Sequence, residues 1–361
     1  MPDLHAARRD RLRGAAIDRG VDAVLVTSLT NVRYLTGFTG SNAALLVAAD
    51  GSDLFGTDGR YLIQAEQEVP DVEPHIDRRT VEALAGRLAR RRTATLGYES
   101  HVVTVDGLQQ LRDLLPQARL VSIEQQVEEF RQVKDEAEIE LLRTACGIAD
   151  RALADLVAAG GVRAGRTERE LGRDLDSRML ELGAEAVSFE TIVASGPHSA
   201  MPHHLPADRA LCDGDFLTLD FGAEYGGYHS DMTRTYVLGE PADWQRELYD
   251  LVAAAQRTGR DALEVGADVA AVDRAAREVI DAAGHAEDFG HGLGHGVGLQ
   301  IHEAPMLGPT ATGTLGGLMP VTVEPGVYLE GRGGVRIEDT LVVRVDGPEL
   351  LTLTSKDLTV L

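Results

Sequence analysis

Two aspartates, Asp220 and Asp231, lie in a stretch that predicts two strands joined by a tight turn. They are equally far from the Tyr225-Gly226 step. A two-residue turn there would make them direct cross-strand neighbours, with Cβ atoms roughly 4.5–5.5 Å apart. Like charges in such positions are destabilising unless a positive group lies between them. The alternative is a pair of solvated surface aspartates, and residues further along the chain distinguish the two.

A second pair of acidic residues, Glu324 and Glu338, is equidistant from Gly331 at the centre of a glycine-rich turn. If the flanking segments form a hairpin, these two side chains also face each other. The Pro325-Gly326 step is expected to introduce a bulge near the first of them. Two helical segments precede each pair, which indicates a weak internal duplication of architecture.

Histidines lie between and beside the two carboxylate pairs. His291 and His295 are four residues apart, but the glycines around them predict a loop rather than a helical metal motif. A lone histidine is more often structural, whereas these two and His302, within twelve positions, favour a catalytic or metal-binding role. His203 and His204 lie in a proline-bracketed loop, which is either a substrate contact or simply solvated.

Four carboxylates and an imidazole form a ligand set for two divalent cations that share bridging carboxylates. Mostly oxygen ligands with one nitrogen suit manganese, cobalt, iron or zinc, and are too soft a set for calcium alone. Two such cations can activate water and polarise a carbonyl group, which is the equipment of a hydrolase.

The elements that must position these residues divide the chain in two. In the first part, strands alternate with helices, which predicts a small α/β domain with a mixed or largely parallel sheet; strands are expected near 22–27, 42–49, 55 and 95–98, helices near 4–19, 59–68, 78–92 and 105–115, and a turn-rich connection over 31–38. A charged segment near Arg131 marks the boundary.

The second part begins with two helices that carry start signals. Asp135 with Glu138, and Thr167 with Glu170, are capping-box pairs. A strand near 189–194 and a loop lead to the Asp220/Asp231 hairpin, and further helices are expected near 242–258 and 268–283, ahead of the second carboxylate pair.

Composition bounds the function. A net charge of −23 argues against binding to nucleic acid or to an anionic membrane, because both need basic patches. Two cysteines make no disulfide framework, and no long apolar run predicts a membrane span. The N-terminus lacks an apolar signal core, so a cytoplasmic enzyme is expected.

The motifs around the candidate ligands resemble those of the pita-bread metallopeptidases, a group that includes aminopeptidase P, prolidase and methionine aminopeptidase. All five positions occur in family order and spacing, in the contexts Leu-Asp-Phe-Gly, His-Ser-Asp-Met-Thr-Arg-Thr, Gly-His-Gly-Val-Gly, Val-Glu-Pro-Gly and Arg-Ile-Glu-Asp. The resemblance implies an α+β pita-bread catalytic domain over residues 131–361. Residues 1–130 resemble the α/β creatinase/prolidase-type N-terminal domain, which favours the proline-specific branch.

The resemblance also assigns roles to residues. It implies two divalent ions, most often manganese with cobalt or zinc as alternatives, held by Asp220, Asp231, His295, Glu324 and Glu338, with Asp231 and Glu338 bridging. His203 would be the substrate-loop histidine, while His291 and His302 would hold the scissile carbonyl. Glu324 would also pass a proton to the leaving nitrogen. Tyr328 and Arg336 would support the ligands.

The implied reaction is hydrolysis of the Xaa-Pro bond in proline-containing peptides, by a homodimer. Aminopeptidase P-like release of the residue before proline is the first interpretation, and prolidase action on dipeptides alone is the alternative. Arg332 could bind a dipeptide carboxylate, block longer chains, or do neither. A creatinase-type amidinohydrolase and an inactive binding module are disfavoured, because such relatives have lost ligands that this chain retains.

Overall fold

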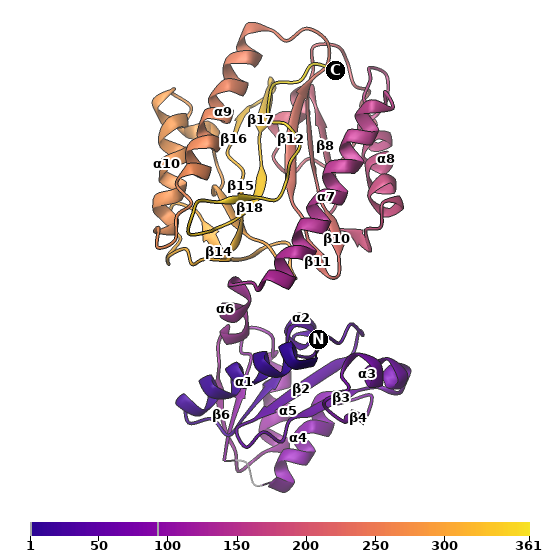
Figure 1. The fold of residues 1–361 in the computed structure, drawn as a ribbon, viewed down its shortest axis with the longest axis vertical. Helices are drawn as coiled ribbons and strands as arrows, with labels where there is room; N and C mark the ends of the chain where they lie inside the picture. Colours follow the sequence, from indigo (N-terminus) through magenta and orange to yellow (C-terminus); the bar gives the residue numbers. More distant parts are fainter. Residues whose placement is uncertain (1, 92–93) are drawn as a thin grey trace. The chain divides into compact units, whose positions relative to one another are not determined.

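A computed structural model describes residues 2–91 and 94–361 and divides the chain into two compact units, Met1–Arg131 and Gln132–Leu361 (Figure 1). Each unit has its own sheets and its own buried apolar side chains. Residue 92, the expected end of the helix near 78–92, lies outside the described residues. None of the described helices is long and apolar enough to cross a membrane.

The first unit contains a six-stranded sheet with the order β4-β3-β2-β1-β5-β6. Strands β1, β2 and β3 run antiparallel, whereas β5 and β6 continue from β1 in parallel and β4 is parallel to β3. The sheet is therefore mixed, as the alternation of strands and helices predicted. The strands span Ala23–Val26 (β1), Ala43–Ala48 (β2), Leu54–Thr57 (β3), Pro74–Ile76 (β4), Thr95–Tyr98 (β5) and Arg119–Ser122 (β6).

Helices cover this sheet. Leu84 and Leu88 of α4 and Leu111 of α5 are buried against apolar residues of the strands, such as Leu25 and Leu46. The α-helices of the unit span Pro2–Asp18 (α1), Leu29–Thr36 (α2), Leu62–Glu68 (α3), Thr80–Arg91 (α4), Val105–Leu114 (α5) and Gln126–Gln132 (α6), and a 3₁₀ turn covers Gly59–Tyr61 (η1).

The expected turn-rich connection over 31–38 is wrong, because helix α2 covers most of this range. Ser28 caps its start by accepting a hydrogen bond from the Asn31 amide. Gly37 ends it in the left-handed region at φ 84°, with its amide donating to the Arg33 carbonyl. Two turns of helix are too short for apolar periodicity to reveal, so the caps were the only available signal.

In the second unit both predicted capping boxes are confirmed. Asp135 and Glu138 bond reciprocally at the start of α7 (Glu136–Ala158), and Thr167 and Glu170 do so at α8 (Glu168–Glu181). In Figure 1 these two helices lie on one side of the strands, with α9 (Asp243–Asp261) and α10 (Val269–Ala282) on the other. The 3₁₀ turns span Gly196–Ala200 (η2) and Ala286–Asp288 (η3).

The strands between the helices form two antiparallel groups. The first has the order β12-β9-β8, with the short β11-β10-β7 sheet beside it, and the second has the order β14-β13-β15-β18-β19, with the hairpin β16-β17. Two helices and an antiparallel sheet thus occur twice, which fits the expected duplication. The strands span Ala186–Val187 (β7), Ile192–Ser195 (β8), Phe216–Phe221 (β9), Ala223–Tyr225 (β10), Tyr228–His229 (β11), Met232–Val237 (β12), Gly294–Gly296 (β13), Glu303–Leu307 (β14), Pro320–Val323 (β15), Gly326–Leu329 (β16), Gly333–Arg336 (β17), Asp339–Val342 (β18) and Glu349–Leu350 (β19).

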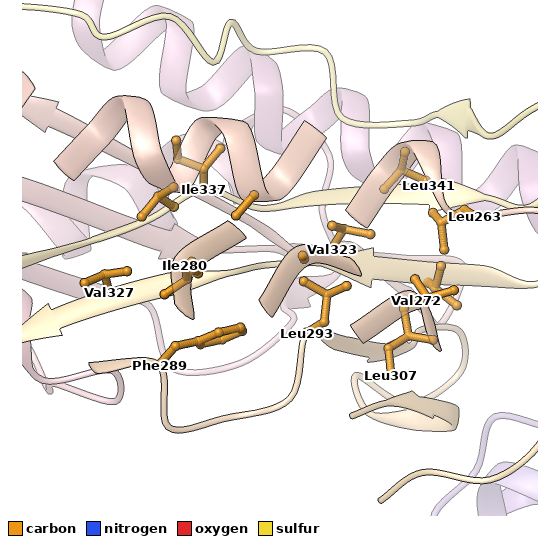
Figure 2. Close-up of a cluster of buried hydrophobic side chains, with 14 of the residues drawn as sticks. Leu263, Val272, Ile280, Phe289, Leu293, Leu307, Val323, Val327, Ile337 and Leu341 are labelled. Atoms are coloured by element: carbon orange, nitrogen blue, oxygen red, sulfur yellow. The ribbon is translucent and has the colours of Figure 1, made fainter. Parts of the chain in front are cut away.

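A buried apolar cluster fixes the strands on either side of Glu324 and Glu338. Figure 2 shows Val272 and Ile280 of α10 facing Val323, Ile337 and Leu341 of the strands and their connection. Burying each such side chain contributes about 1.5–3 kcal/mol. The backbone on both sides of Glu324 and Glu338 is therefore anchored from behind.

Candidate metal centre

Asp220 and Asp231 come from neighbouring strands, but their register differs from the prediction. Asp220 pairs with Thr233, two residues beyond Asp231, so the expected direct pairing is wrong. The reason is the turn, which is formed by Gly226 and Gly227 at φ 60° and 79° rather than by the Tyr225-Gly226 step. Because side chains alternate with a period of two, a shift of two residues keeps both aspartates on one face.

Glu324 and Glu338 occupy the opposed positions that the sequence predicted. On one side of them Val323 pairs with Asp339, and on the other Gly326 pairs with Arg336, in the same register. Pro325 falls between the two ladders, where it has no N–H to contribute. The expected irregularity is therefore a break between strands.

His295 lies on β13, between two glycines that let neighbouring backbones approach. Its Nδ1 is 3.0 Å from the Gly296 carbonyl oxygen and must carry the hydrogen, because a carbonyl can only accept. Nε2 then presents a lone pair, 3.6 Å from Asp231 Oδ2 and 3.5 Å from Glu324 Oε1. A lone pair that faces two carboxylates is favourable only if a cation lies between them.

The five candidate ligands line one cavity of about 800 Å³, to which Asp220, Asp231, His295, Glu324 and Glu338 all contribute. Ligand atoms of Asp231, His295 and Glu338 lie within 4.8 Å of one another, and all three residues are buried. Burial and the neighbouring carboxylates raise the pKa of Asp231 and of Glu338, and burial raises that of Glu324 to about 8. Ionising these groups together is therefore costly without positive charge.

Two carboxylate oxygens test whether cations fit. Among the described residues, Asp220 Oδ1 and Glu338 Oε1 are buried side-chain oxygens with no hydrogen-bond partner. Such atoms are rare in folded proteins, because desolvation without a partner costs free energy. Together with the free Nε2 of His295, they fit divalent cations with mostly oxygen and some nitrogen ligation. The donor set does not by itself select one metal.

Arg336 orients the carboxylates from behind. Its Nη2 donates to Asp220 Oδ2 at 2.6 Å, its Nε to Thr233 Oγ1 at 3.0 Å and its Nη1 to the Tyr328 hydroxyl at 2.9 Å. Thr233 in turn donates to Glu338 Oε2 at 2.7 Å. One guanidinium thus fixes a carboxylate of each pair, directly and through a hydroxyl.

A further buried ion pair, which the sequence reading missed, holds the same strands. Arg234 Nη2 lies 2.8 Å from Asp339 Oδ1, and the guanidinium also donates to the Glu338 carbonyl. Lys356 and Gln256 donate to the other oxygen of Asp339. The available signal was their position close to candidate ligands, because Arg234 is three residues from Asp231 and Asp339 directly follows Glu338.

The histidines predicted for the cavity differ in their exposure and in their hydrogen-bond partners. His203 and His302 line the cavity and are exposed, and the His302 ring is 4.4 Å from that of His295. His291 also lines the cavity, but its Nδ1 donates to the Gly292 carbonyl at 2.8 Å, and its Nε2 accepts from the Tyr328 hydroxyl at 2.9 Å. Burial lowers the pKa of His291 to about 4, so the ring is neutral.

Two residues for which the sequence left a substrate contact open lie outside the cavity lining. His204 directs Nε2 to Glu168 Oε2 at 2.8 Å, and it does not line the cavity. Arg332 packs its guanidinium over the Trp244 ring, 4.0 Å from the centroid, and it is also absent from the lining. Of the described residues that line the cavity, the cationic one is Arg336, which is already paired with Asp220.

Comparisons with known proteins agree on what this arrangement is. Residues 140–345 match the model of metallopeptidase family M24, and residues 8–133 match the creatinase/prolidase N-terminal domain. An Xaa-Pro dipeptidase from Pyrococcus furiosus is 34% identical over 343 residues, which cover 94% of this chain and 96% of the relative.

Solved structures give the same picture. The chain resembles an Xaa-Pro dipeptidase from Bacillus anthracis with a TM-score of 0.94, 36% identity, and coverage of 99% and 100% of the two chains. It resembles an X-Pro aminopeptidase from Thermotoga maritima with a TM-score of 0.90, 35% identity, and coverage of 98% and 99%. The resemblance stated from the motifs and the expected fold class, an α/β N-terminal domain before an α+β pita-bread domain, are confirmed.

Proposed function

The chain belongs to metallopeptidase family M24, and from that premise we propose that it hydrolyses the bond between a residue Xaa and a following proline. The observation that carries the proposal is the convergence of four carboxylates and one imidazole on a single cavity. Relatives named for Xaa-Pro hydrolysis match over nearly the whole chain, in both sequence and structure.

Cations held by the five candidate ligands would supply Lewis acidity and lower the pKa of a nucleophilic water. The chain's own residues would do the rest. Asp220, oriented by Arg336, would receive the free α-ammonium group of the substrate. Glu324, which lines the cavity beside His295, would carry a proton to the leaving proline nitrogen.

Histidines and the cavity wall would position the scissile bond. His203 and His302 are exposed at the cavity and would donate to the substrate carbonyls. Selectivity for proline cannot come from an N–H contact, since a proline nitrogen in a peptide bond has none. It would come from shape, through the apolar wall that includes Ile301, Leu307 and Pro309.

We propose dipeptides as the principal substrates, because several of the matching proteins are named Xaa-Pro dipeptidases or prolidases. Action on longer peptides is the second candidate. It is favoured by the Thermotoga maritima likeness and by Arg332, which is committed to Trp244 instead of forming a carboxylate site in the cavity. Preference for manganese, a homodimer and a cytoplasmic location remain predictions.

A peptide-length series tests the proposal. Ala-Pro, Ala-Pro-Ala and Ala-Pro-Ala-Ala would be incubated with protein loaded with manganese, cobalt or zinc, and with chelated protein as the control. Release of free alanine from the dipeptide above all, and only with metal, is expected. Faster cleavage of the longer peptides would favour the second candidate. Equal cleavage of Ala-Ala-Ala, or cleavage by chelated protein, would refute the Xaa-Pro metallopeptidase assignment.

A further inference from the structure

Glu168 is a buried carboxylate for which the proposed hydrolysis has no use. It is the first residue of α8, and its side chain has 0% exposure. Its Oε1 accepts from the amide and hydroxyl of Ser195 at 2.8 and 2.7 Å. Its Oε2 accepts from His204 Nε2 at 2.8 Å and from the Ala207 amide at 3.1 Å.

These donors belong to one connection, residues 195–207, which we call the histidine loop. His198 Nδ1, in the middle of it, also lies 2.9 Å from Glu168 Oε1. One carboxylate therefore contacts the beginning, the middle and the end of the histidine loop. His203 is part of this loop, immediately before His204, and it faces the catalytic cavity.

The contacts favour an ionised, rigid anchor. Burial opposes ionisation of Glu168, but hydrogen bonds from Ser195 and His204 outweigh it and lower the pKa of this carboxyl. The backbone of the same helical turn contributes too, since the Glu168 and Arg169 amides donate to the Arg209 and Ala207 carbonyls. The histidine loop is thus tied to a packed helix, at the point where that helix begins.

We propose that Glu168, acting through His204, is a positioning residue that holds His203 at the catalytic cavity. The His203 side chain is exposed and has little packing of its own to hold it. Its position therefore depends on the neighbouring residues that hold its backbone. The His204 side chain is absent from the cavity lining, and its bond to Glu168 fixes the chain one residue after His203. The inference rests on the proposed Xaa-Pro hydrolysis. It adds Glu168, which lies about 35 residues before His203, to the residues that determine the rate of that reaction.

A different use of the same cluster is a separate metal site, because Glu168, His198 and His204 offer ligand atoms within 4.8 Å of one another. The surroundings argue against it. Backbone and hydroxyl donors already occupy both carboxylate oxygens, and the Arg209 guanidinium lies 2.6 Å from Ser195 Oγ, which bonds to the carboxylate. The hydrogen-bonding capacity of Glu168 is therefore already used without a metal ion.

A double-mutant cycle tests the proposal in the metal-loaded, full-length protein. Glu168→Gln and His204→Ala would each be measured alone and combined with His203→Ala. Glu170→Gln, which changes an exposed carboxylate of the same helical turn, is the matched control. We expect each single change at 168 or 204 to lower kcat/KM about 10- to 100-fold, as a misplaced substrate contact does. Either change should have little further effect once His203 is absent.

Metal content and hydrogen exchange distinguish a displaced His203 from a general loss of folded structure. Bound metal per chain should be unchanged in Glu168→Gln, and amides of residues 196–207 should exchange faster than in Glu170→Gln. Effects that add to His203→Ala, or loss of one bound ion per chain, would overturn the inference. If the wild-type protein cleaved no Xaa-Pro peptide, that result would instead refute the proposed function. Hydrogen exchange would then decide the anchoring role: unchanged exchange over residues 196–207 would overturn it.

Discussion

Tyr328 links the buried guanidinium of Arg336 to His291 in the cavity through two hydrogen bonds. Its hydroxyl accepts from Arg336 Nη1 and, having one hydrogen, donates it to His291 Nε2, both at 2.9 Å. Burial raises the pKa of Tyr328 to about 12, so this hydrogen stays in place at neutral pH. The orientation of His291 therefore depends on the arginine that also fixes Asp220.

Tyr328→Phe should lower kcat for an Xaa-Pro peptide about 10-fold or more, while metal content is unchanged. The change leaves Arg336 Nη1 and His291 Nε2 without their partner, and a hydrogen bond to a charged group contributes about 1.5–3 kcal/mol. Steady-state kinetics and metal analysis of the purified variant measure both quantities. Tyr249→Phe is the control, because that buried hydroxyl donates to the Lys356 carbonyl instead. A kcat for Tyr328→Phe no lower than that of Tyr249→Phe would contradict the coupling.

At the scale of the element, glycines decide how β13 carries its histidine. A Cβ at Gly294 would lie 2.1 Å from the Thr322 carbonyl oxygen, and one at Gly296 would lie 2.4 Å from that of Ala304. The neighbouring strands therefore approach β13 more closely than any side chain allows. The Gly-His-Gly sequence is a packing requirement that brings His295 to the carboxylates.

Gly294→Ala should separate β13 from β15, abolish metal binding and destabilise the protein by about 1–3 kcal/mol or more, as overpacking does. Calorimetric titration with manganese and urea unfolding would measure the two effects. Gly290→Ala is the matched control, because a Cβ at that exposed position meets nothing within 4 Å. If Gly294→Ala bound metal as tightly as Gly290→Ala, close strand approach would not be what positions His295.

Local sequence signals predicted those elements whose structure depends on neighbouring residues. The capping boxes at Asp135 and Thr167 and the register of Glu324 with Glu338 follow from side chains or turns close in sequence. The predicted partner of Asp220 was wrong by two residues, because the turn forms at Gly226 and Gly227 instead of at Tyr225-Gly226.

The contacts that cross long distances in sequence could not be predicted in this way. Glu168 falls between the capping residues Thr167 and Glu170, and nothing local indicates that it meets Ser195 and His204. The pairing of Arg234 with Asp339 spans more than a hundred residues in the same manner. Tertiary packing brings these partners together, within one group of strands for Glu168 and between the two groups for Arg234 and Asp339.

At the scale of the whole molecule, the candidate ligands are confined to one of the two compact units. Asp220 to Glu338 all belong to Gln132–Leu361, while the apolar core of Met1–Arg131 is built from its own strands and helices. Binding to the folded state stabilises only the unit that forms the site. The two units should therefore respond differently to the removal of metal.

Differential scanning calorimetry of the intact chain should show two transitions, of which chelation lowers only one. With free manganese at about a thousand times its dissociation constant, one bound ion adds about 4 kcal/mol. For a domain of this size that corresponds to a shift of about 8–16 °C. The other transition should stay in place in the same scans.

Asp231→Asn identifies which transition belongs to the site. The variant should lose the response to manganese. Its metal-free transition should occur at or above the wild-type temperature, because an amide avoids the cost of ionising a buried carboxylate beside Glu338 and Glu324. Two transitions that shift together on chelation would mean that the units unfold cooperatively. A manganese response that survives in Asp231→Asn would show that the stabilising ions bind outside the proposed centre.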